Sequence, residues 1–208
     1  MKWIIFDAWG VTYTSSDDIA ELMLPYLQQR NPAITYEQIR AVYWPACMGE
    51  ITPLEFWTAL GFADQYPAIE HDYLSVGPRL DPEFLAVAES FLGRYGMAML
   101  SNDVRDWSAF LRRRFGLERF LHTAVISGEI VGVRKPDRQM FDMLLERIGA
   151  SPAECVLIDD RPKNIRGAAE LGFRTIRFLR ETHPDEFPAD LTIRRLAELP
   201  AAVERLLA

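Results

Sequence analysis

The chain has 208 residues, 49% of them hydrophobic, which is enough for one main domain of ordinary size with an insertion. Its formal net charge of -7, with no basic run longer than residues 112–114, argues against a nucleic-acid partner. No apolar stretch approaches the ~20 residues that span a bilayer, and the carboxylate of residue 7 comes too early for a signal peptide, so we expect a cytoplasmic protein without a membrane partner.

Short apolar runs, bounded by polar or turn residues, recur along the chain and predict buried parallel strands. They cover residues 3–6, 97–100, 124–126, 156–158 and 175–178. Segments with helical periodicity separate several of them, at residues 106–115, 138–148 and 163–171. This alternation of strands and helices predicts an α/β fold with a doubly wound parallel sheet.

The interval between the first two strands has no strand-like alternation. It carries amphipathic helix patterns at residues 17–29, 35–42 and 53–60, and we interpret residues 14–89 as a helical cap inserted into a core made of residues 1–13 and 90–208. The cap contains an aromatic cluster, which either packs the small lobe or shapes an apolar substrate pocket: Tyr43, Trp44, Phe56 and Trp57. At the other end of the chain, HPDEFP and a helix-like segment at residues 196–208 are expected to close an edge of the core.

Ligands of an open parallel sheet bind outside the carboxyl ends of its strands, so the polar residues that follow the strands are the candidates for chemistry. Six polar side chains follow a predicted strand or lie in the loop before a predicted helix: Asp7, Ser101, Asn102, Lys135, Asp159 and Asp160. A nucleophilic carboxylate, a hydroxyl, an amide, an ammonium group and an acidic pair are what phosphoryl transfer through an aspartyl intermediate requires.

Four segments in chain order, FDAWGVTY, LSND, RKPD and LIDDRPKN, resemble motifs I to IV of the haloacid dehalogenase (HAD) superfamily. Taken singly, Asp7 could merely end a strand, Ser101 could cap a helix and Lys135 could lie on the surface. The order and spacing of all four motifs favour the resemblance. It implies a Rossmann-like core, hydrolase activity and a cap of the helical C1 type between motifs I and II.

The resemblance implies that Asp7 is the nucleophile and becomes an aspartyl-phosphate. It also implies a Mg²⁺ ion held by Asp7, the backbone carbonyl of Trp9 and Asp160, with Asp159 acting directly or through water. Such an ion would mask the negative charge between the carboxylate and a phosphate dianion. A small phosphorylated metabolite is the implied substrate.

The remaining roles concern the transferred phosphoryl group. Lys135 would neutralise it together with Asp7. Ser101 and the backbone amides near Trp9 and Asn102 would hold its oxygens. Asn164, four residues beyond Asp160, is a candidate partner of the metal ligands.

One position departs from the phosphatase pattern. HAD phosphatases usually carry a second Asp two residues after the nucleophile, where this chain has Trp9. An indole has no basic nitrogen lone pair and cannot shuttle protons. Loss of such a general acid and base typically lowers the rate ~10²–10⁴-fold. A phosphatase acting on a substrate with a good leaving group is the first explanation.

Two alternatives remain open. The 2-haloacid dehalogenase branch has a similar motif I, and its reaction releases a halide, which leaves without a proton. Against this alternative, those enzymes use no metal, and Asp159 and Asp160 would repel the carboxylate of a haloacid. No cap arginine is clearly placed for that carboxylate, although Arg30 and Arg40 are candidates. The other alternative is an idle scaffold that binds a phospholigand or a protein, against which the retained set of charged residues argues, because mutually repelling acids destabilise an empty site.

Overall fold

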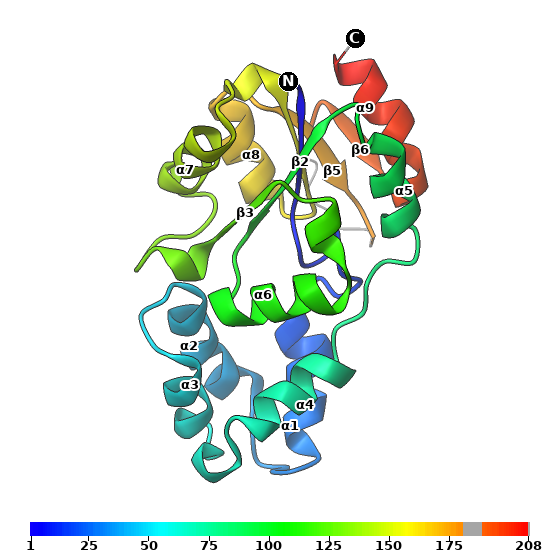
Figure 1. Cartoon of the computed structure of the whole chain (residues 1–208). Coiled ribbons are helices and arrows are strands. Elements are labelled where there is room, and N and C mark those ends of the chain that lie inside the picture. Colours follow the sequence, from blue (N-terminus) through cyan, green and yellow to red (C-terminus); the bar gives the residue numbers. More distant parts are fainter. Residues whose placement is uncertain (181–188, 208) are drawn as a thin grey trace.

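The computed structural model describes residues 1–180 and 189–207 (Figure 1). Its centre is a six-stranded parallel sheet in the order β3-β2-β1-β4-β5-β6. The strands are β1 (Trp3–Phe6), β2 (Gly96–Ser101), β3 (Thr123–Ile126), β4 (Cys155–Asp159), β5 (Arg174–Phe178) and β6 (Leu191–Ile193). The predicted α/β fold with a doubly wound parallel sheet is confirmed.

The sixth strand was not predicted from the sequence. It has only three residues, LTI, and pairs with β5 alone at the edge of the sheet. Such a short strand does not contain the longer apolar run by which buried strands are detected in a sequence. A helix follows it at residues 199–207, shorter than the predicted segment. The HPDEFP segment lies outside the described residues.

Helices cover both faces of the sheet, because successive strand residues point to opposite sides. In β1, Ile5 faces the layer formed by α7 (Arg138–Ile148) and α8 (Pro162–Glu170). Phe6 faces the other layer, which contains α5 (Phe84–Phe91), α6 (Arg105–Arg114) and α9 (Leu199–Leu207). All four residues of β1 are buried, as expected for a central parallel strand.

The predicted cap segment folds into short helices beyond the carboxyl ends of the strands (Figure 1). They are a π-helix (Ile19–Met23), α1 (Leu24–Gln28), α2 (Tyr36–Cys47), α3 (Pro53–Ala59), a 3-10 helix (Ala63–Gln65) and α4 (Ala68–Val76). Thr35 and Thr52 begin α2 and α3 with capping boxes. Helix α2 extends five residues beyond the predicted end and includes Pro45, so the proline did not terminate it.

Two chain segments that lie side by side join the cap to the core. Tyr13 and Leu80 form an antiparallel bridge between them. Beyond the second segment, α5 belongs to the core layer, where the ring of Phe84 lies 5.1 Å from that of Phe6. We therefore propose that the cap ends at residues 79–81 rather than at the predicted residue 89.

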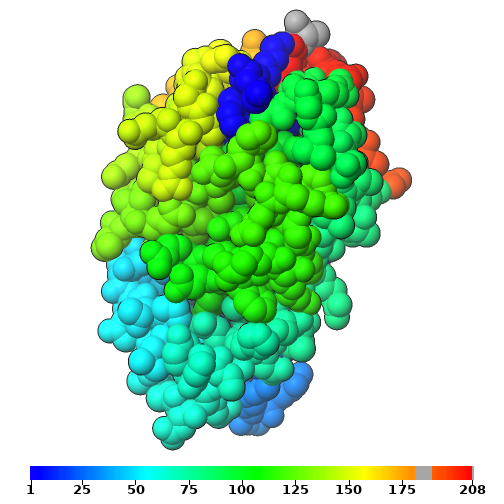
Figure 2. Space-filling model, viewed as in Figure 1, coloured from blue at the N-terminus to red at the C-terminus, as the bar shows by residue number. Residues whose placement is uncertain are grey.

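Helix α6 belongs to the core and packs against the cap. In Figure 2 its atoms (green) adjoin those of the cap (cyan) without a gap in this view. Trp107 of α6 is buried among cap aromatic rings, with Phe56 at 5.2 Å and Trp57 at 6.2 Å. The indole N–H groups of Trp57 and Trp107 both donate to the same oxygen of Glu70. No helix in the described part of the chain is long and apolar enough to cross a membrane.

Candidate active site

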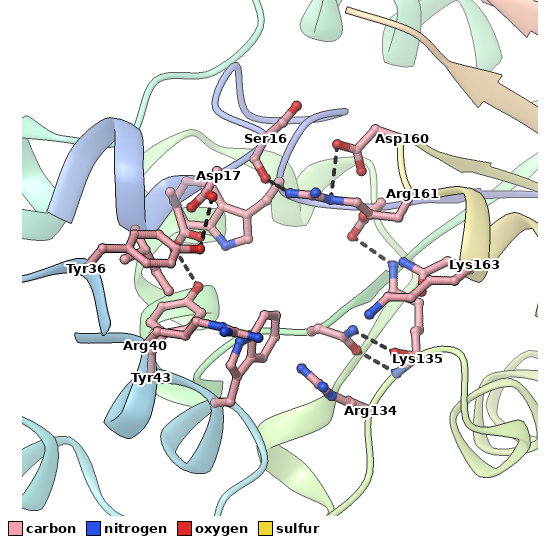
Figure 3. Close-up of a pocket in the computed structure, with 17 residues that line it drawn as sticks. Ser16, Asp17, Tyr36, Arg40, Tyr43, Arg134, Lys135, Asp160, Arg161 and Lys163 are labelled. Atoms are coloured by element: carbon pink, nitrogen blue, oxygen red, sulfur yellow. Dashed lines mark hydrogen bonds and ion pairs between the residues drawn. The ribbon is translucent and has the colours of Figure 1, made fainter. Parts of the chain in front are cut away.

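A cavity of about 280 Å³ opens between the carboxyl ends of the strands and the cap (Figure 3). The core contributes Asp7, Trp9, Asn102, Arg134, Lys135, Asp160, Arg161, Lys163 and Asn164 to its lining. The first cap linker and the cap contribute Ser16, Asp17, Asp18, Ile19, Tyr36, Arg40, Tyr43 and Trp44. The cavity thus brings together most of the residues predicted for the site. It also contains charged residues that were not predicted, among them Asp18, Arg134 and Lys163.

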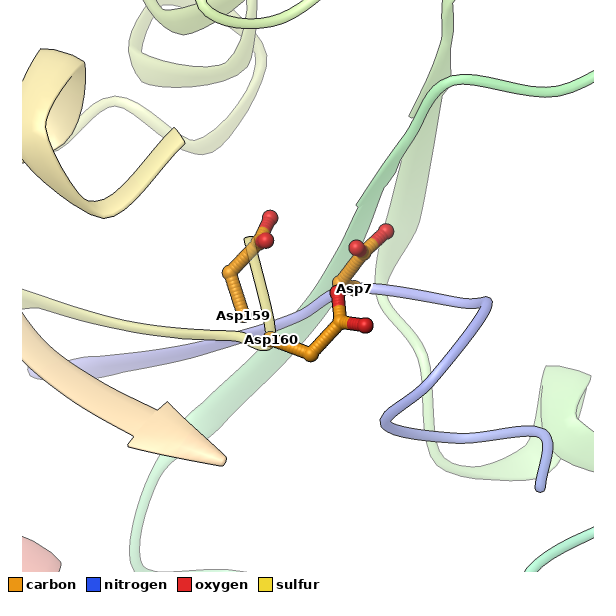
Figure 4. A group of neighbouring side chains, drawn as sticks. All are labelled: Asp7, Asp159 and Asp160. Atoms are coloured by element: carbon orange, nitrogen blue, oxygen red, sulfur yellow. The ribbon is translucent and has the colours of Figure 1, made fainter. Parts of the chain in front are cut away.

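Strand register explains why the acids meet. Phe6 pairs with Ile158 across β1 and β4. Asp7 directly follows β1, and its backbone N–H donates to Ile158 O at 2.9 Å, so it lies beside Asp159, the last residue of β4. Asp160 follows directly. One ligand atom from each of these three carboxylates lies within 4.8 Å of the others (Figure 4).

Lys135 is the cation of this group, and its side chain is completely buried. Its Nζ lies 2.9 Å from Oδ1 of Asp7 and 2.7 Å from Oδ2 of Asp159. The loop that carries it is fixed by Asn102, whose amide accepts a hydrogen bond from Lys135 N (2.7 Å) and donates one to Lys135 O (3.1 Å). The motif II amide therefore positions the motif III lysine.

Burial and mutual repulsion govern the charges. Burial, and next the charge of Asp159, raise the pKa of Asp7 well above its usual range, against the opposing effect of Lys135. Burial alone would lower the pKa of Lys135, but Asp159 and Asp7 raise it above its ordinary value, so the ammonium stays charged. Burial and then Asp159 raise the pKa of Asp160 to about 6. Lys135 contacts Asp7 and Asp159, and Arg161 lies 3.5 Å from Asp160, so three clustered acids face two cations. The remaining negative charge favours an additional cation.

The acids of motif IV differ in their contacts. Both oxygens of Asp159 are occupied, by Lys135, by the Asn164 amide at 3.0 Å and by the Arg161 backbone N–H at 2.8 Å. Oδ1 of Asp160 is buried and has no hydrogen-bond partner among the described residues. The predicted partner Asn164 thus contacts Asp159 rather than Asp160.

The backbone of Gly10 closes one side of this acidic site. It has φ +80°, and a Cβ built there would lie 2.3 Å from Oδ2 of Asp160, so both the conformation and the space require glycine. Oxygen donors, the excess of negative charge and the unpartnered Asp160 oxygen fit a hard divalent cation.

Two predicted residues differ from the rest in their surroundings. Ser101 is buried, does not line the cavity, and its Oγ has no hydrogen-bond partner among the described residues. Trp9 lines the cavity with only 8% of its surface exposed, and its ring packs edge-on against Tyr13 at 5.2 Å. An apolar ring therefore occupies the position of the usual second Asp.

The aromatic cluster of the cap divides between the two interpretations given above. Phe56 and Trp57 are completely buried in the packing of the cap. Tyr43 and Trp44 line the cavity. The cluster therefore contributes both to the core of the cap and to the wall of the cavity.

Asp18, at the start of the cap, was missed by sequence reasoning. It lines the cavity but is only 7% exposed, and Oδ2 accepts a hydrogen bond from the Tyr43 hydroxyl at 2.5 Å. Burial raises its pKa to about 7, although that hydrogen bond opposes the shift. In the sequence, Asp17 and Asp18 resemble an ordinary acidic helix start, and only burial distinguishes them.

Comparison with known proteins gives both phosphatases and a dehalogenase. A glyceraldehyde 3-phosphate phosphatase of Methanopyrus kandleri is 33% identical over 141 residues, which cover 64% of this chain and 59% of that protein. A phosphoserine phosphatase of Thermus thermophilus is 36% identical over 121 residues (54% and 48%). An (S)-2-haloacid dehalogenase 4A of Burkholderia cepacia is 27% identical over 108 residues (50% and 46%). The chain thus spans about half the length of the curated relatives it matches.

The fold is shared with solved structures as well. The crystal structure of a HAD phosphatase from Thermococcus onnurineus matches with a TM-score of 0.73 and 20% identity, over 98% of each chain. The family model described as haloacid dehalogenase-like hydrolase matches residues 1–172, from β1 through α8. The match covers most of the chain and all four motif segments, so this protein belongs to the haloacid dehalogenase-like hydrolase family.

Proposed function

We propose that the protein is a Mg²⁺-dependent phosphohydrolase that acts on a small phosphorylated metabolite through an aspartyl-phosphate on Asp7. The main support is the buried group in which one lysine contacts two of three clustered carboxylates. The phosphatase relatives agree with this reaction class. A cavity of about 280 Å³ suits a small metabolite. The cytoplasmic location expected from the sequence stays a prediction.

The proposed metal ligands are Asp7, the backbone carbonyl of Trp9 and Asp160. Asp160 has the free buried oxygen, whereas Asp159 is fully hydrogen-bonded, so we assign Asp159 to orienting Lys135 and the metal ligands. When bound, Mg²⁺ would mask the negative charge between the Asp7 carboxylate and the substrate phosphate.

The chain's own groups would carry the phosphoryl transfer. A carboxylate oxygen of Asp7 attacks phosphorus, and the bond from phosphorus to the leaving oxygen breaks. Water then attacks the phosphorus of the aspartyl-phosphate, the bond from phosphorus to the Asp7 oxygen breaks, and inorganic phosphate leaves. Lys135 stabilises the charge on Asp7 and on the transferred group, while the backbone N–H groups near Trp9 and Asn102 would hold the phosphoryl oxygens. Ser101 does not line the cavity, so its role as a further phosphoryl ligand stays a prediction. Trp9 donates no proton to the leaving oxygen, so we expect substrates with good leaving groups, such as acyl or sugar 1-phosphates.

A haloacid dehalogenase is the second candidate, and one observation favours it. Arg40 of the cap lines the cavity, where it could receive a haloacid carboxylate; Arg30 instead pairs with Asp72 at 2.8 Å and is not part of the lining. The buried, unpartnered oxygen of Asp160 argues the other way, because without a metal it would repel that carboxylate. An idle scaffold is the third candidate, and the preserved contacts of Lys135 with both acids argue against it.

Hydrolysis of p-nitrophenyl phosphate, acetyl phosphate and 2-chloropropionate, each with Mg²⁺ and with EDTA, separates the candidates. We expect metal-dependent phosphate release that Asp7→Asn abolishes and whose metal response Asp160→Asn weakens. Asp142→Asn, which removes a carboxylate from the surface of α7, is the matched control. Metal-independent chloride release would instead establish the dehalogenase, and an unchanged metal response in Asp160→Asn would remove Asp160 from the proposed site.

A further inference from the structure

Three cations of the cavity lining make no ion pair with any residue that the structure describes. Arg40 comes from α2 of the cap, and Arg134 and Lys163 come from the core (Figure 3). Within residues 1–180 and 189–207, none of these three side chains makes a hydrogen bond or an ion pair. The other two cations of the lining, Lys135 and Arg161, do contact carboxylates.

Arg134 has the most specific environment of the three. Its guanidinium lies 4.2 Å above the ring of Trp44, a cap residue, so it is held across the boundary between core and cap. Nη1 is buried and lacks an acceptor among the described residues. A buried guanidinium N–H without an acceptor is unfavourable unless a ligand supplies one.

Lys163 lies close enough to Arg134 and Arg161 for their positive charges to repel its own. Burial, then Arg134 and Arg161, lower its pKa. Cations that repel one another at the wall of a cavity become favourable neighbours when an anion binds between them. Lys135 already neutralises the negative charge at Asp7, where the phosphoryl group would bind. The positive charge of the three unpaired cations is therefore available for another anionic group of the ligand.

We propose that Arg134, with Lys163 and Arg40, forms a subsite for a second anionic group of the substrate, so that the preferred substrates are phosphomonoesters that carry a carboxylate or a second phosphate. The inference rests on the proposed phosphohydrolase function and narrows its substrate class. Arg134 supplies the directional N–H donors, and Lys163 and Arg40 supply positive charge. Phosphomonoesters with a neutral or cationic remainder are the poorer substrates.

A set of four compounds with the same three-carbon chain tests this. They are propyl phosphate, 3-phosphonooxypropanoate, 3-aminopropyl phosphate and 1,3-propanediol bisphosphate. All four expel an alkoxide, so their turnover is slow in a protein with Trp9, and the comparison uses the ratio of their kcat/KM values rather than the rates themselves. We expect kcat/KM for the carboxylate or the bisphosphate to exceed that for propyl phosphate by ~10–100-fold, the effect of one or two hydrogen bonds to a charged group. The ammonium compound should be the worst, and the ranking of carboxylate against bisphosphate identifies the second group.

The same ratio measured in variants assigns the effect to the subsite. Arg134→Gln should lower the ratio of anionic to neutral substrate ~10-fold or more, and because the ratio is internal to each variant, a partial loss of folded protein does not change it. Arg113→Gln, which removes an exposed arginine of α6 outside this cavity, should keep the wild-type ratio. Equal kcat/KM for propyl phosphate and the anionic compounds in the wild type would overturn the proposal.

Binding separates failure of the subsite from failure of the phosphatase function. Calorimetric titration of Asp7→Asn with propyl phosphate and with 3-phosphonooxypropanoate gives the affinity ratio without turnover. Tighter binding of the carboxylate compound, lost in Asp7→Asn/Arg134→Gln, would support the subsite even if the wild type hydrolysed none of the four compounds. Equal affinities would overturn the subsite proposal. The phosphohydrolase proposal would be unaffected, because it depends on phosphate release by the wild type and not on this affinity ratio.

Discussion

The Nζ atom of Lys135 lies 2.9 Å from Oδ1 of Asp7, and both side chains are buried. The same ammonium group contacts Asp159 at 2.7 Å, so one cation compensates two carboxylates that would otherwise repel each other. In the proposed mechanism, catalysis and stability therefore depend on the same contact.

Replacing Lys135 by methionine should abolish turnover and lower the free energy of unfolding by ~3–5 kcal/mol, the usual cost of leaving a buried charge unpaired. The pKa of Asp7 is already raised in the folded state, and without Lys135 it rises further. The folded protein then binds a proton that the unfolded chain releases, so the variant loses more stability at pH 8 than at pH 5. Urea unfolding at the two pH values measures this.

Two further variants check the cause of that loss. Lys163→Met removes an exposed lysine of the same cavity and should change the free energy of unfolding by less than ~1 kcal/mol. Adding Asp159→Asn to Lys135→Met removes the repulsion and should restore part of the lost stability. A Lys135→Met protein as stable at pH 8 as the wild type would refute this account of the contact.

Asp18 should make the stability fall as the pH rises. Its pKa is about 7 in the folded protein against an ordinary value of 3.8, so between these pH values only the folded state holds the proton. The free energy of unfolding therefore decreases from about pH 4 to pH 7, by ~1.4 kcal/mol for each unit of pKa difference. Asp18→Asn should match the wild type at pH 4 and be more stable at pH 8. Asp142→Asn, an exposed control, should follow the wild type, and a parallel curve for Asp18→Asn would exclude Asp18 as the source.

Trp9→Asp should improve turnover of substrates with poor leaving groups. A carboxyl group two residues after Asp7 could protonate the leaving oxygen, an effect of ~10²-fold or more, whereas aryl and acyl phosphates would gain little. The diagnostic quantity is the ratio of kcat/KM for propyl phosphate to kcat/KM for p-nitrophenyl phosphate, because kcat/KM reports the transfer to Asp7, whereas kcat also includes hydrolysis of the aspartyl-phosphate. Trp9→Asn is the matched control, since it opens the same space without an acid. If both variants raise the ratio equally, the added space rather than the acid is responsible.

Glu70 should hold the cap to the core. One of its oxygens accepts from the indole N–H groups of Trp57 (2.9 Å) and Trp107 (2.7 Å). Glu70→Ala leaves both without an acceptor and should cost ~1–3 kcal/mol for each. Glu70→Gln keeps a carbonyl acceptor and should lose less. Chemical unfolding followed by tryptophan fluorescence compares them, and equal stability of the two variants would argue against these hydrogen bonds.

The sequence was sufficient for the parts of the site that strands position. Asp7 and Asp159 end apolar runs, so a parallel register alone brings them together, and the predicted strands and family are confirmed. Lys135 was predicted from its motif. The structure adds the reason for its position, because the Asn102 amide forms hydrogen bonds with both the backbone N–H and the backbone carbonyl of Lys135.

What was missed depends on contacts between segments far apart in the chain. Arg134 and Lys163 stand next to recognised motifs but become notable only because the cap, through Trp44, encloses them. The altered pKa of Asp18 follows from burial under Tyr43, which no local pattern reveals. Edge strand β6 is too short to give a periodic signal.

The central claim is that Asp7 forms an aspartyl-phosphate, and trapping that intermediate tests it most directly. The protein is mixed with radiolabelled acetyl phosphate and Mg²⁺, quenched in acid within one turnover, and mapped by mass spectrometry, with EDTA and Asp7→Asn as the two blanks. We predict one acid-stable phosphoryl group on the peptide that contains Asp7, absent from both blanks. Phosphate release at the normal rate with the label on another residue, or in Asp7→Asn, would contradict the account.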